Sequence, residues 1–158
     1  MMDRVPMTPD GFKKLSEELD RLLKEERPQN IKDIATARAH GDLSENAEYT
    51  AAKEKQSFLE GRIAELQSKI SMAQVIDPSK IKGGKISFGA KVKVFDLDTD
   101  EEKVFFLVGP DEADVKTGKI SISSPVGKAL LGKVVGDEAI IKAPSRTFSY
   151  EVMEIIFE

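Results

Sequence analysis

Three carboxylates stand three residues apart in a short polar stretch of the N-terminal half. The stretch is HGDLSENAEY, residues 40–49, and its acids are Asp42, Glu45 and Glu48. Carboxylate oxygens suit a hard cation such as Mg²⁺, which keeps several of its waters when bound. Two or three such acids on an exposed turn bind Mg²⁺ only weakly. A metal site here would therefore need further ligands from another molecule.

The same spacing also has a purely structural interpretation. Asp42 and Glu45 have the spacing of a capping box, in which Asp42 caps the following helix and Glu45 reaches back to the cap's backbone amide. Negative charge also suits a helix N-terminus. The spacing alone favours this interpretation, and the two are compatible because a cap can pre-orient the acids.

Other chemistries have little support. His40 is the only histidine and the chain has no cysteine, so disulfides and zinc sites of mixed nitrogen and sulfur ligands are excluded. A lone histidine next to the end of a helix is more often a structural or helix-dipole partner than a zinc ligand. The stretch GKALLGK, residues 127–133, lacks the spacing and the trailing Ser or Thr of a phosphate-binding loop. We therefore expect no self-sufficient active site.

Two basic residues flank the acidic stretch. Arg38 precedes the turn and Lys53 follows it. They are either a solvated helix flank or contacts to a phosphate backbone beside the acids. The alternating charges of Lys53, Glu54 and Lys55 favour the solvated interpretation for Lys55.

Helical periodicity surrounds the acidic stretch on both sides. Thr8-Pro9 is a helix start signal, and Arg27-Pro28 predicts a kink with a shift of register. The helix should end near His40, with Gly41 as a left-handed cap. Its apolar stripe comprises Phe12, Leu15, Leu19, Leu22, Ile31, Ile34 and Ala35.

The second helix carries a coiled-coil seam of 3-4 spacing. Its members are Tyr49, Ala52, Gln56, Leu59, Ile63, Leu66, Ile70 and Ala73. The turn at Gly41 is short, so the two arms form an antiparallel hairpin about 45 Å long. Small residues predict a narrow tip, where the seam consists of Ala35, Ala39, Ala47 and Ala52. A dimerisation element is the alternative that periodicity alone leaves open.

The second half changes to strand periodicity. The expected strands are ISF (86–88), KVKVFDL (91–97), KVFFLV (103–108), KISIS (119–123), AIIKA (139–143) and SYEVMEIIF (149–157). Ser124-Pro125 predicts a short helix, closed by Gly132. Hairpin-sized links indicate an antiparallel sheet with one helix on it. The fold class is thus α+β with two domains: a hairpin over 1–76 with its tip at 41–48, a linker over 77–85 and a sheet domain over 86–158.

Charge and hydropathy argue against duplex DNA and a membrane as direct partners. The 158 residues are 33% charged, which fits long exposed helices, and each half of the chain carries 12 basic and 14 acidic residues. The electrostatic drive toward duplex DNA is therefore weak. No apolar run approaches the length of a membrane span, and the N-terminus has no signal-peptide core. We expect an intracellular protein.

Several separate motifs resemble one family. ARAHGDLSENAEYTAAKEKQSFLEGRI, residues 37–63, is similar to the coiled-coil tip of bacterial transcript cleavage factors of the Gre family. MTPDG (7–11), AQVID (73–77) and SPVGKALLGK (124–133) also resemble that family, so the resemblance covers essentially the whole chain. Leu43 and the lack of a strongly basic rod resemble its less basic branch.

The resemblance implies a function carried out inside another enzyme. Family members bind RNA polymerase and insert the hairpin into its secondary channel. Asp42 and Glu45 would there help to hold an Mg²⁺ shared with the polymerase, which cleaves backtracked RNA near its 3′ end. Ser44, Asn46 and Glu48 would support the tip.

The resemblance also implies how the remaining parts act. Arg38 and Lys53 would lie beside the RNA. An FKBP-like C-terminal domain would dock on the polymerase, with Ser124, Pro125, Gly127 and Gly132 as candidates, although a structural helix is the alternative there. The free protein would hold no cofactor and have no enzymatic activity. We expect a monomer in the bacterial cytoplasm that reaches the nucleic acid of the elongation complex only through the polymerase.

Two other classes of function compete with this one. A peptidyl-prolyl isomerase in the C-terminal domain would need an aromatic-lined pocket. The aromatic residues available are Phe88, Phe95, Phe105, Phe106, Phe148, Tyr150 and Phe157. A purely structural coiled-coil adaptor or dimer would not need the tip acids at all.

Overall fold

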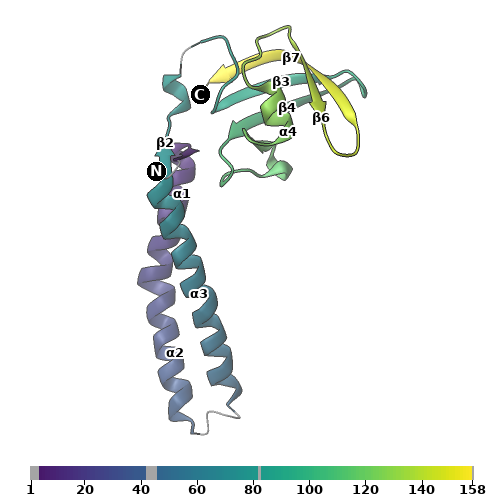
Figure 1. The fold of residues 1–158 in the computed structure, drawn as a ribbon. Coiled ribbons are helices and arrows are strands. Elements are labelled where there is room, and N and C mark those ends of the chain that lie inside the picture. The colour runs from purple at the N-terminus through teal and green to yellow at the C-terminus, as the bar shows by residue number, and fades with distance from the viewer. Residues whose placement is uncertain (1–3, 42–45, 82, 158) are drawn as a thin grey trace. The chain divides into compact units, whose positions relative to one another are not determined.

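The computed structural model describes residues 4–41, 46–81 and 83–157, which form two compact units (Figure 1). One unit is a helical hairpin over Phe12–Met72. The other joins the described residues up to Gly11 with those from Ala73 onward. The N-terminal strand therefore belongs to the sheet-bearing unit, whereas the sequence pattern places these residues with the hairpin.

The hairpin has two long arms that run side by side in opposite directions (Figure 1). The first arm comprises α1 (Pro9–Arg21), a π-helical turn η1 (Leu22–Glu26) and α2 (Arg27–Ala39). The second is a single helix, α3 (Ala47–Met72). The predicted antiparallel hairpin is thereby confirmed.

The ends of the first arm follow the predicted signals. The Thr8 hydroxyl accepts the Gly11 backbone N–H at 3.1 Å, and Pro9 is the first helical residue. At the other end His40 is the C-cap, and Gly41 has a φ of 108°. A residue with a side chain is strained in that conformation, which explains the glycine.

The interruption at Pro28 takes the form of a π-helical turn. Pro28 has no N–H to offer the carbonyl four residues back, so the turn before it widens. The Arg27 N–H donates instead to the Leu22 carbonyl, five residues back. The wider turn holds one extra residue, and the buried stripe beyond it is displaced by that amount.

The displaced stripe changes which residues form the seam near the tip. The buried residues there are Asn30, Ile34, Ala37 and Ala52. The prediction that Ala35, Ala39 and Ala47 form the seam is wrong, since all three are exposed. Ile31, also predicted inside, is 57% exposed. Farther from the tip the predicted leucines do pack together, around Leu22, Ile63 and Leu66.

The sheet unit contains a five-stranded sheet of order β5-β4-β3-β7-β6. Its strands are β3 (Ala90–Asp96), β4 (Glu101–Val108), β5 (Lys119–Ser121), β6 (Glu138–Lys142) and β7 (Thr147–Phe157). Four of them pair antiparallel as expected, but β5 lies parallel to β4. Residues 109–118, which include the 3-10 helix η3 (Val115–Thr117), carry the chain back along β4 and make the parallel pair possible.

A second, two-stranded sheet joins distant parts of the chain. β1 (Val5–Met7) pairs parallel with β2 (Ala73–Val75) directly after α3. Beside it the Glu112 carboxylate accepts the Thr8 N–H at 2.6 Å and the Thr8 hydroxyl at 2.7 Å. These contacts explain why the first residues belong to the sheet unit.

Residues 77–80 and 86–88, in and directly after the predicted linker, have local structure that differs from the prediction. The 3-10 helix η2 (Pro78–Lys80) begins at Asp77, whose carboxylate accepts the Ser79 N–H at 3.0 Å. The predicted strand over 86–88 is wrong, because Ile86 exchanges single backbone bonds with the loop after α4 (Pro125–Leu130) instead of entering the sheet. An isolated pair of bonds anchors a loop but builds no ladder.

The core of the sheet unit lies under one face of the sheet. Alternate residues of β3 are fully buried, among them Val92 and Val94, and α4 contributes Leu130. Asp96 at the end of β3 is also buried, and its carboxylate accepts the N–H groups of Asp98 and Thr99 in the β3–β4 turn. The β3–β4 hairpin turn is therefore closed by a buried acid.

Candidate functional site

The hairpin tip is where the sequence places its chemistry, and both ends of the turn are described. The Gly41 N–H donates to the Arg38 carbonyl at 3.3 Å at the end of the first arm. Asn46 stands directly before α3. Asp42, Ser44 and Glu45 lie outside the described residues, so their roles as acids and supports stay predictions.

Asn46 connects the two arms through its side chain. Its Oδ1 accepts the Tyr49 N–H at 3.0 Å, which caps the start of α3. Its Nδ2 donates to the Ala37 carbonyl in the last turn of α2 at 2.6 Å. The described start of α3 thus has a cap of its own, and explaining it requires no capping role for Asp42.

Glu48, the third acid of the motif, faces the lone histidine. The His40 Nδ1 lies 2.9 Å from a Glu48 carboxylate oxygen, and both side chains are more than half exposed. This contact joins the end of the first arm to the first turn of α3. The contact with Glu48 fits the structural role predicted for His40.

The predicted RNA-proximal pair, Arg38 and Lys53, lies on one flank of the seam. Both line a groove between α2 and α3, together with Ile31, Ile34, Ala35 and Gln56. The Arg38 guanidinium lies 5.8 Å from the centre of the Tyr49 ring on the opposite arm. The Lys53 ammonium donates to the Gln56 amide oxygen at 2.8 Å. The structure thus places two cations from different arms in one groove.

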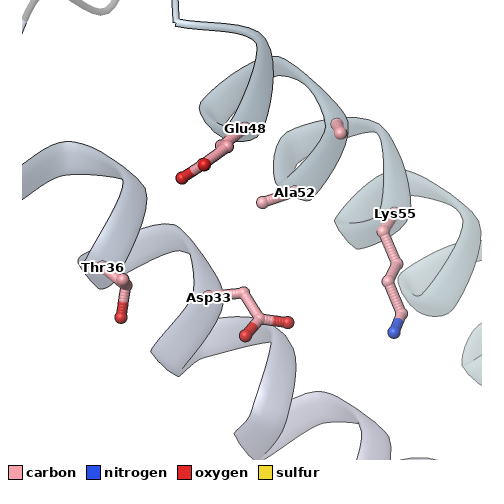
Figure 2. Close-up of a pocket in the computed structure, with 6 residues that line it drawn as sticks. Asp33, Thr36, Glu48, Ala52 and Lys55 are labelled. Atoms are coloured by element: carbon pink, nitrogen blue, oxygen red, sulfur yellow. The ribbon is translucent and has the colours of Figure 1, made fainter. Parts of the chain in front are cut away.

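The opposite flank of the seam has a different character. Figure 2 shows a second groove near the tip, lined by Asp33, Thr36, Glu48, Ala51, Ala52 and Lys55. At about 100° per residue, Asp33 and Arg38 lie about 140° apart around α2. Carboxylates thus line one flank, and the cations Arg38 and Lys53 line the other. Lys55 is on the acidic flank, 3.8 Å from Glu26, which fits its interpretation as a solvated residue.

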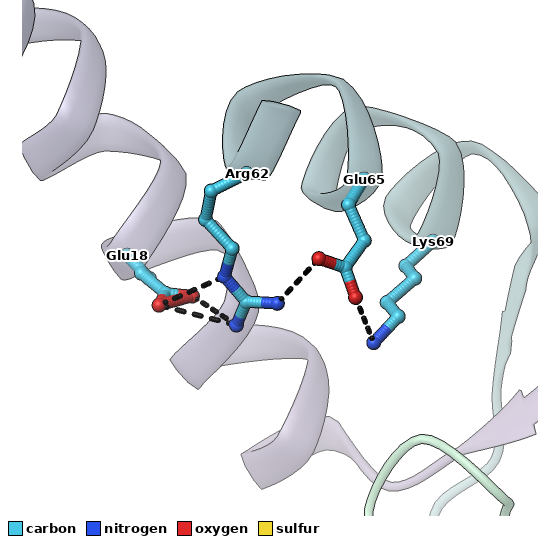
Figure 3. A network of polar contacts seen from close by, with 4 residues as sticks. All are labelled: Glu18, Arg62, Glu65 and Lys69. Atoms are coloured by element: carbon cyan, nitrogen blue, oxygen red, sulfur yellow. Dashed lines mark hydrogen bonds and ion pairs between the residues drawn. The ribbon is translucent and has the colours of Figure 1, made fainter. Parts of the chain in front are cut away.

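A polar network holds the arms together farther from the tip. The Arg62 guanidinium donates to both carboxylate oxygens of Glu18 on the other arm and also reaches Glu65, which pairs with Lys69 (Figure 3). The hydrogen bonds that Arg62 donates to Glu18 raise the pKa of Arg62. The Lys69 ammonium, and then Arg62, lower the pKa of Glu65.

Arg27 and Asn30 add two further contacts between the arms. The Arg27 guanidinium donates to both carboxylate oxygens of Glu60. The buried Asn30 amide donates to the Ala52 carbonyl at 3.0 Å. Sequence reasoning missed these contacts because only the pairing of the arms determines which charged residues face one another.

The candidate docking residues of the sheet unit all have structural contacts around α4. Ser124 caps the helix by accepting the Gly127 N–H at 3.1 Å, and its hydroxyl donates to the Ser121 carbonyl at 2.7 Å. Pro125 is the first helical residue, and Gly132 has a φ of 83°. These contacts support the structural alternative, and docking stays a prediction for the same residues.

The aromatic residues of the isomerase alternative pack within the sheet unit. Phe105 and Phe148 lie against the buried Tyr150, with ring centres 5.6 and 5.4 Å away. Phe88 is also buried. These side chains are parts of the core or packed on it, and no observation favours the isomerase.

The described residues neither complete a metal site nor span a membrane. Among residues 4–41, 46–81 and 83–157, no three His, Asp or Glu side chains are grouped to hold a metal ion. In the same part of the chain no helix is long and apolar enough to cross a membrane.

Models of one class of protein, the transcription elongation factors, match both parts of the chain. The family model described as "Transcription elongation factor, N-terminal" matches residues 5–75, and that described as "Transcription elongation factor, GreA/GreB, C-term" matches residues 81–157. The chain therefore belongs to the GreA/GreB family and is a transcription elongation factor.

Two relatives known from their sequences agree with this assignment, and a solved structure is also similar to the chain. Transcription elongation factor GreA of Thermodesulfovibrio yellowstonii is 70% identical over 158 residues, which are 100% of both chains. GreA of Rhizobium leguminosarum bv. viciae is 58% identical over 155 residues, 98% of each chain. The crystal structure of GreA factor homolog 1 of Thermus thermophilus is 30% identical, with 97% of this chain and 99% of that chain covered and a TM-score of 0.44.

Proposed function

We propose that the protein binds RNA polymerase, inserts its helical hairpin into the secondary channel and stimulates the polymerase's own cleavage of backtracked RNA. Family membership supports the transcriptional role. The observation that carries the rest is the hairpin itself, which has Asp42 and Glu45 in the turn between its arms. In the sequence these acids stand between the two arms, far along the chain from the strands of the sheet, and a partner's site would use them.

Asp42 and Glu45 would complete a metal site that belongs mainly to the polymerase. Carboxylate oxygens suit Mg²⁺, and two of them leave room for waters and for the partner's ligands. When bound, the metal ions supply activation of a water and stabilisation of the leaving oxygen. The task of this chain is to present the two carboxylates, with Ser44, Asn46 and Glu48 supporting the turn. On this view the chain is no enzyme by itself and holds no cofactor when free.

The groove that contains Arg38 and Lys53 would face the RNA. Two cations on one flank can each neutralise a phosphate. The carboxylates of the other flank would repel the RNA, so the rod would accept it on one side only. This arrangement would give the hairpin one preferred rotation about its long axis inside the channel.

The sheet unit would hold the factor on the polymerase surface. Its contacts include the α4 region from Ser124 to Gly132. The factor would act as a monomer in the bacterial cytoplasm, where it reaches the RNA 3′ end and the other nucleic acid of the elongation complex through the polymerase.

The test is RNA cleavage in a stalled, backtracked elongation complex with Mg²⁺. The Asp42→Asn/Glu45→Gln variant should compete for polymerase like the wild type and yet fail to stimulate cleavage. The matched control, Glu25→Gln/Glu54→Gln, removes the same number of charges from exposed positions of the hairpin and should stay active. If the tip variant cleaves as well as the wild type, the acids are no part of the reaction and the proposal is wrong.

A further inference from the structure

Asn46 makes two hydrogen bonds of opposite sense to two different helices. Its Oδ1 accepts from the Tyr49 N–H of α3, and its Nδ2 donates to the Ala37 carbonyl of α2. The orientation of the amide is determined by these partners, because a backbone N–H can only donate and a carbonyl can only accept. The amide of this half-buried side chain therefore has one orientation that satisfies both partners.

A helix cap alone would not require an amide. Asp, Ser and Thr accept the capping N–H as well as Asn does. The bond to Ala37, in contrast, needs a donor on the same short side chain, which a carboxylate lacks. The Ala37 carbonyl also accepts the His40 N–H at 3.2 Å. Asn46 thus fastens the start of α3 to the last turn of α2.

This bond lies at one end of the acid-bearing segment. The four residues 42–45 connect Gly41 to Asn46, and Gly41 is bonded to Arg38 on α2. Asn46 ties the other end of the segment to the same turn of α2. The neighbouring contacts between the arms are His40 with Glu48 and Arg38 with Tyr49, and all of these side chains except the half-buried Tyr49 are exposed. They are less able to hold one geometry.

We propose that Asn46 is a positioning residue for transcript cleavage. The Nδ2 bond to the Ala37 carbonyl fixes the spacing of the described ends of the segment, Gly41 and Asn46, and the polymerase site depends on that spacing when it receives Asp42 and Glu45. This inference rests on the proposed function. It assigns the amide a role in presenting the acids that is separate from its role as a helix cap.

The decisive variant is Asn46→Asp, which keeps the capping oxygen and removes the donor. Stability should be retained, because Asp caps well and its charge suits the N-terminus of α3. Cleavage at saturating factor should fall by roughly 10- to 100-fold, since small misplacements of reacting groups have costs of that order. The factor concentration at half-saturation should not change. The Mg²⁺ concentration for half-maximal cleavage should rise.

Asn46→Ser controls for the added charge, because its hydroxyl can cap but is too short to bond both partners. Loss of cleavage by both variants, with polymerase competition and melting temperature unchanged, supports the positioning role. Wild-type cleavage by both variants, or loss with Asp alone, overturns it.

The Asp42→Asn/Glu45→Gln variant, measured in parallel, separates this inference from the proposed function. If that variant is inactive while Asn46→Asp and Asn46→Ser are active, only the positioning role fails. If it cleaves like the wild type, the proposed function fails first and the positioning role fails with it.

Discussion

Arg27 on α2 and Glu60 on α3 form a two-bonded ion pair between the arms of the hairpin. The guanidinium Nε and one terminal nitrogen each donate to a different carboxylate oxygen, at 2.9 and 2.7 Å. The pair stands directly beside the π-helical turn and Pro28, where the α-helical bonding of the first arm is interrupted. It therefore supports the arm at its interruption.

This pair predicts an acid-sensitive contribution to the stability of the hairpin. The Arg27 guanidinium holds the pKa of Glu60 below its ordinary value. A lowered folded-state pKa stabilises the fold above the ordinary carboxyl pKa, and this stabilisation is lost as the pH falls through the folded value. Glu60→Gln should therefore lower the melting temperature more at pH 7 than at pH 3. Thermal unfolding followed by circular dichroism checks this, and an equal difference at both pH values would contradict it.

Gly61 predicts a stabilising substitution in the hairpin. It lies in the middle of α3 and is exposed, and a Cβ added there meets no atom within 4 Å. Gly61→Ala should stabilise the hairpin by roughly 0.5–1 kcal/mol, because alanine loses less conformational entropy in a helix. Chemical denaturation measures this change. A destabilised variant would show that the described surroundings of Gly61 are wrong.

Gly127 predicts the opposite effect for the same substitution in the sheet unit. A Cβ there would lie 2.1 Å from the Ser121 carbonyl oxygen, so α4 has to move away from β5. Gly127→Ala should destabilise the sheet unit by about 1–3 kcal/mol, as overpacked cores do. Chemical denaturation of the Gly61→Ala and Gly127→Ala variants side by side tests the predicted gain and the predicted loss of stability. Unchanged stability would mean that α4 does not pack closely on this edge.

The two flanks of the tip predict unequal effects of removing cations. Arg38→Ala and Lys53→Ala should each lower cleavage in the backtracked complex, most clearly at low salt, because they remove phosphate contacts that salt weakens. Lys55→Ala, on the acidic flank, should leave cleavage near the wild-type rate. The measurement is cleavage against salt concentration for the three variants. Equal losses for all three would indicate a general effect of charge without a preferred flank.

Much of the fold follows from local patterns in the sequence. Thr8 and Pro9 mark the helix start, Gly41 marks the helix end and Ser124 with Pro125 marks α4, because capping depends on residues close in the chain. The hairpin follows from two apolar stripes separated by a short turn. Residue type and spacing indicate the acids of the tip, the family resemblance selects Asp42 and Glu45 among them, and their role stays a prediction.

Other features depend on contacts between distant residues and could not be predicted from local patterns. Pro28 signalled an interruption, but only the structure shows a π-helical turn that replaces Ala35 with Ala37 in the seam. Likewise, the parallel pairing of β5 depends on the path of residues 109–118.

For the tip, the sequence by itself determined which residues carry charge and which can cap a helix. The tertiary structure alone decided that Asn46 bonds to Ala37 and that Arg38 shares a groove with Lys53. The physical reason is that a side chain's partner is set by the rotation and register of both helices. Local propensity fixes neither of these before the arms pack together.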